Sequence, residues 1–119
     1  LQFRCVCFRS STDIARRVGG RDPEVGALLH RVVAVLDGAG VPVTACGEAA
    51  GEPLQALAMI GAGVRSLSMS PGRVGPIKAM CRSLHVAPLG RFVGTLCAGT
   101  EADLRPALAA FARDHSVRI

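Results

Sequence analysis

The sequence predicts an α/β fold in which short buried strands alternate with helices. Three observations carry this prediction. Apolar, partly β-branched runs at 41–46 and 64–69 have the length of buried strands. Longer segments between and after them repeat apolar residues at helical spacing. Hydrophobic residues make up 50% of the 119 residues and aromatic residues only 3%, so aliphatic side chains must build the core between closely packed layers.

The first clear helix follows Asp22, a suitable N-cap residue, with Pro23 at the first helical position. Its apolar residues recur every three or four positions, at Val25, Leu28, Leu29, Val32, Val33 and Leu36. Gly38 and Gly40 end this helix. Before it, residues 1–8 alternate weakly and predict a strand.

Glycine and proline divide the rest of the chain into elements. The expected order is a strand at 41–46, a loop at 47–52, a helix at 53–61, a strand at 64–69, a helix from the turn at 70–72 to about 84, and helices at about 87–97 and 101–114. Thr100 is expected to cap the last helix, with Asp103 in a capping-box position. Glu52 directly precedes Pro53, so helix capping is its expected role.

This order of elements predicts parallel βαβ units whose sheet is buried on both faces. The loops after Cys46 and Met69 both leave the carboxyl ends of strands, so we expect them at the same edge. In barrels and open α/β sheets, that edge holds the active site.

Composition and charge narrow the possible partners. The net charge is +5 and the pI is about 9.5, yet the arginines are scattered and no aromatic residues interleave with them. A nucleic-acid partner is therefore not expected. A small anionic substrate explains a few arginines equally well, and a GC-rich genome explains the excess of Arg over Lys without any function.

The five cysteines have neither the even number of a disulfide framework nor the spacing of a zinc site. We expect reduced thiols and a cytoplasmic protein. The longest apolar runs are shorter than a membrane span, so no membrane partner is expected. The chain begins with Leu1 rather than Met, as a fragment would.

The segment Cys46-Gly47-Glu48-Ala49-Ala50-Gly51-Glu52-Pro53 resembles the Cys-Gly-Glu loop of phosphoenolpyruvate-utilising enzymes. That family includes Enzyme I of the bacterial phosphotransferase system, pyruvate phosphate dikinase and phosphoenolpyruvate synthase. The similarity continues through Met59-Ile60-Gly61-Ala62-Gly63 and Ser66-Leu67-Ser68-Met69-Ser70-Pro71. It covers about 22–84, and the tail at 85–119 resembles that of the nitrogen-related Enzyme I paralogue.

The resemblance implies a fold and an activity. In that family this stretch supplies the last strands of a (β/α)8 TIM barrel, which takes roughly 250 residues. This chain is thus expected to be a partial phosphoenolpyruvate-binding domain with about three βα units, followed by C-terminal helices at 85–119. The implied activity transfers the phosphoryl group of phosphoenolpyruvate to a protein histidine and on to a histidine-containing phosphocarrier protein, releasing pyruvate. The family uses Mg²⁺, the full-length parent is expected to be a homodimer, and the isolated chain is expected to be inactive.

The resemblance makes Cys46 the catalytic acid that protonates the enolate left by phosphoryl transfer. The alternative reading of a free cysteine is a small buried hydrophobic residue. We expect that state for Cys81 and Cys97, which fall within helical patterns.

Glycines and serines near Cys46 have further expected roles. Gly47 and Gly51 are expected to let the backbone pass close to the substrate. Ser68 and Ser70 either form hydrogen bonds at the barrel rim or satisfy the strand end. His30 is expected on a helix surface.

The first residues depart from the family pattern. There, an Asn-Asp pair binds phosphoenolpyruvate and magnesium, and an arginine binds the substrate. By resemblance, Asp13 matches the metal ligand, and Thr12, Asp13 and Arg21 match the substrate-binding residues. Thr12 replaces Asn and the spacing to Arg21 is shorter than in the family. The alternative, that residues 1–21 are altered or out of frame and bind no ligand, therefore stays open.

Two other functions stay open beside Enzyme I activity. The chain is alternatively a non-catalytic remnant or dimerisation module of the family, because the upstream half is missing. It is alternatively a fragment of a pyruvate phosphate dikinase or phosphoenolpyruvate synthase, although the Ser-Leu-Ser-Met-Ser run and the tail favour Enzyme I. The choice between sugar uptake and nitrogen regulation is also open.

Overall fold

The computed structural model describes residues 23–99 and 103–119. The element order is α2 (Pro23–Gly38), β1 (Thr44–Cys46), the 3₁₀ helix η1 (Glu48–Gly51), α3 (Pro53–Gly61), β2 (Ser66–Ser68), α4 (Pro71–Arg82), α5 (Val86–Ala98) and α6 (Arg105–Asp114). The mixed α/β class is confirmed, with mostly helical content. The strand expected at 1–8 and the N-cap expected at Thr100 lie outside the described residues.

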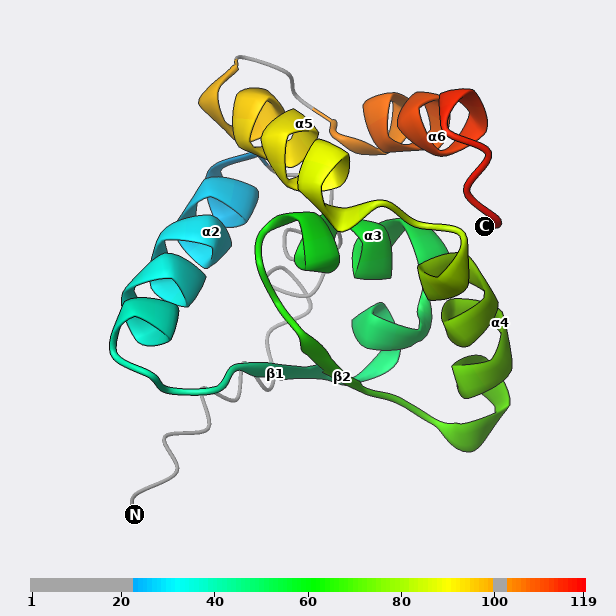
Figure 1. Ribbon diagram of the computed structural model, residues 1–119, viewed down its shortest axis with the longest axis horizontal. Helices are drawn as coiled ribbons and strands as arrows, with labels where there is room; N and C mark the ends of the chain where they lie inside the picture. The colour runs from blue at the N-terminus through cyan, green and yellow to red at the C-terminus, as the bar shows by residue number, and fades with distance from the viewer. Residues whose placement is uncertain (1–22, 100–102) are drawn as a thin grey trace.

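Strands β1 and β2 form a two-stranded parallel sheet, as the βαβ pattern predicts. Each has three residues, fewer than the runs at 41–46 and 64–69 from which it was predicted. Apolar character alone predicted the longer runs, whereas only the residues that pair across the sheet form the strands. Figure 1 shows the sheet below helices α2, α3, α5 and α6.

The sheet is not buried on both faces, so that expectation is wrong for the described residues. In both strands the middle residue is half-buried and its two neighbours are exposed. The described helices cover one face of this sheet (Figure 1), and parallel sheets become continuously apolar only where both faces are covered.

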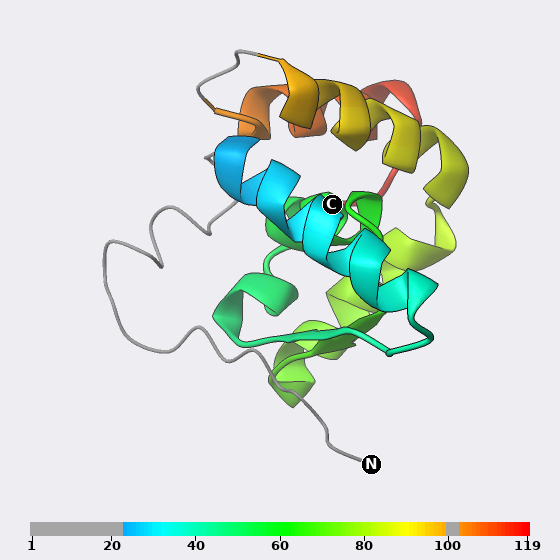
Figure 2. The same cartoon turned by 90° about the vertical axis from the view of Figure 1, so that its left-hand side faces the viewer.

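Helix α3 lies at the centre of the fold and packs against α2, α4, α5 and α6. Figure 2 shows α2 in front of α3 and beneath α5. The main core cluster joins α3 to the C-terminal helices through buried residues such as Leu57, Met80, Leu89 and Leu108. A smaller cluster of Val33, Met59 and Val64 contacts Ala45 and Leu67, the inward residues of the two strands. The sheet is thus anchored through one face.

The last helix begins at Arg105 rather than at 101, which corrects the predicted boundary. Asp103 precedes it, and an Oδ1 atom of this residue accepts a hydrogen bond from the backbone N–H of Arg105 at 3.0 Å. Pro106 gives the physical reason: proline fits the first turn of a helix but disrupts an interior, where its N–H would be missing.

Candidate functional site

The candidate site lies at the carboxyl ends of β1 and β2, which coincide in the sheet. Thr44 pairs with Ser66, Ala45 with Leu67, and Cys46 with Ser68. Immediately beyond the last pair, the Gly47 backbone N–H donates a hydrogen bond to the Ser68 carbonyl oxygen at 3.2 Å. The structure therefore confirms that the loops after both strands leave the same edge.

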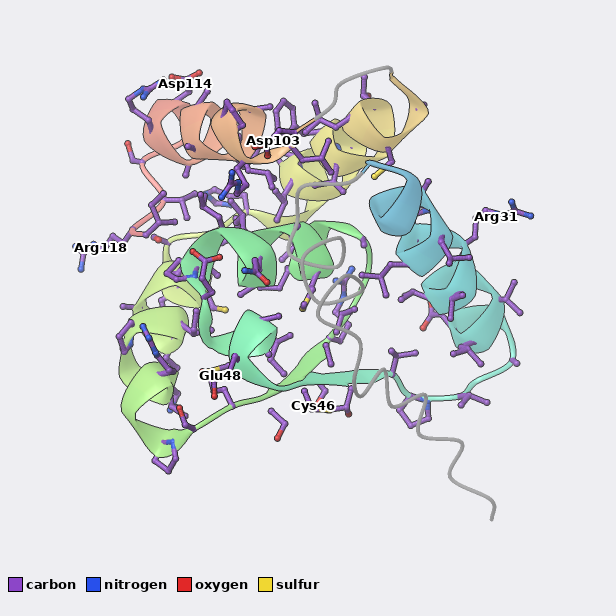
Figure 3. All side chains as sticks on the ribbon, turned by 180° about the vertical axis from the view of Figure 1, so that it is seen from behind. Arg31, Cys46, Glu48, Asp103, Asp114 and Arg118 are labelled. Atoms are coloured by element: carbon purple, nitrogen blue, oxygen red, sulfur yellow. The ribbon has the colours of Figure 1, made fainter. Side chains whose placement is uncertain are left out.

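Side-chain alternation separates the sheet into an inner and an outer face. Ala45 and Leu67 pack toward the core, whereas Cys46 and Ser68 are exposed with their neighbours on the other face. Figure 3 shows Cys46 at the sheet, at the end of the molecule opposite Asp114. Cys46 is a free, exposed cysteine, and no described helix covers the face on which it lies (Figure 1).

The loop after Cys46 begins at a residue that needs glycine. Gly47 has φ 105°, a region that residues with a Cβ rarely adopt. The chain then enters η1, where the Ala50 N–H donates to the Gly47 carbonyl oxygen at 3.1 Å and Ala50 is fully buried. This 3₁₀ turn stands where a plain loop was predicted, and it fixes the direction in which the chain leaves the strand.

Gly51 makes a close approach, but to a protein side chain. A Cβ at this position would lie 2.9 Å from Cγ and 3.0 Å from Cβ of Arg73, in the first turn of α4. Gly51 therefore makes room for a side chain of α4. That it also lets the backbone pass close to the substrate stays a prediction. Sequence reasoning missed Arg73 as a neighbour of the loop. Its position three residues after Ser70, just past the second strand, was the available signal.

The two glutamates of the loop have different environments. One Oε atom of Glu52 accepts a hydrogen bond from the Gln55 backbone N–H at 2.9 Å, so the predicted capping role is confirmed. Glu48 is exposed and caps no helix with its side chain.

The other described cysteines differ from Cys46 in their surroundings. Cys97 is half-buried against the main core, and burial raises the pKa of its thiol. Cys81 is exposed on α4, so the expectation of a buried residue is wrong there, although partial burial of its thiol also raises its pKa. A helical pattern places a residue on a helix but does not determine what covers it.

The expected ligands Thr12, Asp13 and Arg21 lie outside the described residues. Within residues 23–99 and 103–119, no three His, Cys, Asp or Glu side chains gather as metal ligands. His30 is exposed on α2, as expected.

A shallow groove of about 530 Å³ between α5 and α6 is not part of this site. Its lining includes Phe92, Phe111, Asp114 and His115. Asp114 lies at the opposite end of the molecule from Cys46 (Figure 3). No helix in the described part of the chain is long and apolar enough to cross a membrane.

The residues of this site fall within a stretch of the chain that matches a known protein family. The model of the family described as "PEP-utilising enzyme, PEP-binding domain" matches residues 1–86. The chain belongs to this phosphoenolpyruvate-utilising family. The matched range includes both strands and the Cys46 loop, and it includes residues 1–21, which depart from the expected motif.

Two curated relatives carry names of phosphoryl-transfer proteins. A phosphoenolpyruvate-protein phosphotransferase of Cupriavidus necator is 32% identical over 85 residues, covering 71% of this chain and 14% of that protein. A multiphosphoryl transfer protein of Rhodobacter capsulatus is 36% identical over 86 residues, covering 72% of this chain and 10% of that protein. This chain thus spans about a seventh or less of the length of these relatives. No solved structure matches it significantly.

Proposed function

We propose that this chain is part of a phosphoenolpyruvate–protein phosphotransferase, in which Cys46 donates a proton to the enolate of pyruvate. The observation that carries the proposal is the position of the Cys46 thiol, exposed at the carboxyl end of a parallel strand on the face that no described helix covers. In a (β/α)8 barrel that face is the interior, and substrates bind at the carboxyl ends of the strands. The family match over residues 1–86 supports both the fold and the substrate class.

The proposed chemistry assigns one step to this chain. The phosphoryl group of phosphoenolpyruvate passes to a protein histidine outside this chain and then to a phosphocarrier protein. The remaining enolate takes a proton from the Cys46 thiol at its methylene carbon, which yields pyruvate and a thiolate. Solvent reprotonates the exposed thiolate before the next turnover.

Mg²⁺ would neutralise charge on the phosphoryl group when bound. Asp13 is the residue of this chain that we propose as a ligand, with Thr12 and Arg21 beside the substrate. No group of three His, Cys, Asp or Glu side chains gathers within the described residues, and no step here depends on the geometry of the ion.

The decisive experiment is Cys46→Ala in the full-length parent. Steady-state pyruvate formation from phosphoenolpyruvate with the phosphocarrier present should fall by about 10²-fold or more, the usual contribution of a general acid. Cys81→Ala is the matched control, because it removes an exposed thiol from α4, and it should leave turnover unchanged. Wild-type turnover in Cys46→Ala would rule out the acid role.

A second candidate, a non-catalytic remnant or dimerisation module, is favoured by the departure of residues 1–21 from the family's Asn-Asp motif, in which Thr12 stands in place of Asn. Titration of phosphoenolpyruvate with Mg²⁺ into the isolated chain tests it by calorimetry. We expect no binding, since the histidine and several ligands of the anion lie outside this chain. Binding at sub-millimolar concentration would contradict the remnant.

A further inference from the structure

The last residue pair of the sheet brings a hydroxyl next to the candidate acid. Cys46 and Ser68 are register partners, and neighbouring strands lie about 4.8 Å apart. Both residues are exposed, and the residue before each packs toward the core, so both side chains project from the same face. Cys46 and Ser68 are therefore neighbours across the sheet, with both side chains on its outer face.

This pairing is fixed from two directions. Gly47, the residue after Cys46, donates a hydrogen bond from its backbone N–H to the Ser68 carbonyl oxygen at 3.2 Å. Leu67 packs on both core clusters. A slip of one residue in register would turn Leu67 to the outer face and lose that burial.

The Ser68 hydroxyl is available as a donor. No hydrogen bond involves its Oγ within the described residues, in contrast to Ser83. The Ser83 hydroxyl donates to the Met80 carbonyl oxygen at 2.9 Å and accepts from the Arg118 backbone N–H at 3.0 Å. Ser66 lies two pairs back and faces Thr44, so Ser68 is the serine that directly opposes Cys46.

We propose that Ser68 is a positioning residue for Cys46, donating a hydrogen bond from its hydroxyl to the sulfur. The inference rests on the proposed acid role of Cys46. As the S–H bond breaks and a C–H bond forms on the enolate, the sulfur keeps the electron pair of the S–H bond. Ser68 donates to the resulting thiolate without losing its own proton, and hydrogen bonds to charged groups are the stronger ones.

The first test follows alkylation of Cys46 by iodoacetamide in the full chain from about pH 6 to about pH 10, read on the Cys46 peptide by mass spectrometry. Ser68→Ala should move the midpoint of this pH profile upward by about one unit, because the thiolate loses its donor. Ser68→Thr should restore the wild-type midpoint. Ser66→Ala, which removes a hydroxyl two pairs away, should leave it unchanged.

Two outcomes would overturn the inference. One is a wild-type midpoint for Cys46 in Ser68→Ala. The other is an equal shift of the Cys81 and Cys46 peptides, which would mean a general change of structure rather than loss of one hydrogen bond.

A second measurement separates this inference from the proposed function. In the full-length parent, Ser68→Ala should lower kcat about tenfold with KM unchanged, since the hydroxyl stabilises a state formed only as the proton leaves. If Cys46→Ala keeps wild-type turnover while Ser68→Ala still shifts the alkylation profile, the acid role fails and the pairing stands. If Cys46→Ala is inactive and Ser68→Ala changes neither the profile nor kcat, the pairing fails and the acid role stands.

Discussion

At the scale of single residues, the Glu52 carboxylate caps the N-terminus of α3. Glu52 is the N-cap, with an extended backbone, and Pro53 follows at a position where its missing N–H costs nothing. The Gln55 N–H would otherwise lack a partner in the first turn. This one hydrogen bond joins the Cys46 loop to α3, the helix with the most buried residues in the described part of the chain.

Glu52→Ala should therefore lower the free energy of unfolding by about 1 kcal/mol, the usual cost of losing a cap. Urea denaturation of the isolated chain measures it. Glu48→Ala, in the same loop but exposed and without a capping bond, should change stability by less than about 0.5 kcal/mol. Equal effects of the two changes would contradict the capping role.

The Cys97 thiol should make the stability of the fold fall as the pH becomes alkaline. Burial raises the pKa of its thiol above the ordinary value of 9.0, so the folded state holds the proton more tightly than the unfolded state. The resulting stabilisation is complete below about pH 9 and is lost as pH rises through the folded pKa. Between about pH 8 and about pH 10, the Tm of the wild type should fall more than that of Cys97→Ala. Parallel losses in the two proteins would refute this.

At the scale of elements, the crossing of α3 and α5 depends on small residues. A Cβ at Gly61 would collide with the Val93 side chain and lie 3.2 Å from Cγ of Leu89. Gly90 of α5 faces the same crossing. A Cβ added at Gly90 would lie 3.7 Å from the Gly61 carbonyl oxygen. The glycine spacing thus sets how closely the two helices pack.

Gly61→Ala should destabilise the protein by about 1–3 kcal/mol, because the added methyl group overpacks this crossing. Gly94→Ala is the matched control within α5, where a Cβ meets nothing within 4 Å. It should stabilise by about 0.5–1 kcal/mol, since glycine weakens a helix interior. Denaturation midpoints that move in the same direction would show that the crossing is not tightly packed.

At the scale of the whole molecule, the two core clusters hold different elements together. The main cluster joins α3, α4, α5 and α6 and extends to Val117 in the tail. The smaller cluster holds α2 and the inner face of the sheet against α3. No described helix covers the outer face of the sheet, where Cys46 and Ser68 are exposed (Figure 1).

Leu108→Ala should lower the free energy of unfolding by about 2–5 kcal/mol, because Leu108 is 1% exposed within the main cluster. Val35→Ala removes a side chain that is 72% exposed on α2 and should change stability by less than about 0.5 kcal/mol. Chemical denaturation followed by circular dichroism checks both. A small effect of Leu108→Ala would mean that α6 does not fold as part of the main cluster.

The sequence by itself determined the α/β class, the order of the described α-helices and strands, the parallel pairing, the Glu52 cap and the family. Each of these depends on residues close together in the chain: proline and glycine at element ends, apolar spacing within them, and the Cys46 motif. Local patterns of this kind do not depend on contacts between residues that are distant in the sequence, so they can be read from the sequence alone.

Only the tertiary structure decided what lies across from each residue. It paired Cys46 with Ser68, put Arg73 against Gly51, left Cys81 exposed and covered the sheet on one face. These features depend on contacts between elements that are separate in the sequence. A helical or strand pattern shows which residues share a face, whereas burial and neighbours follow from the packing of that face against another element.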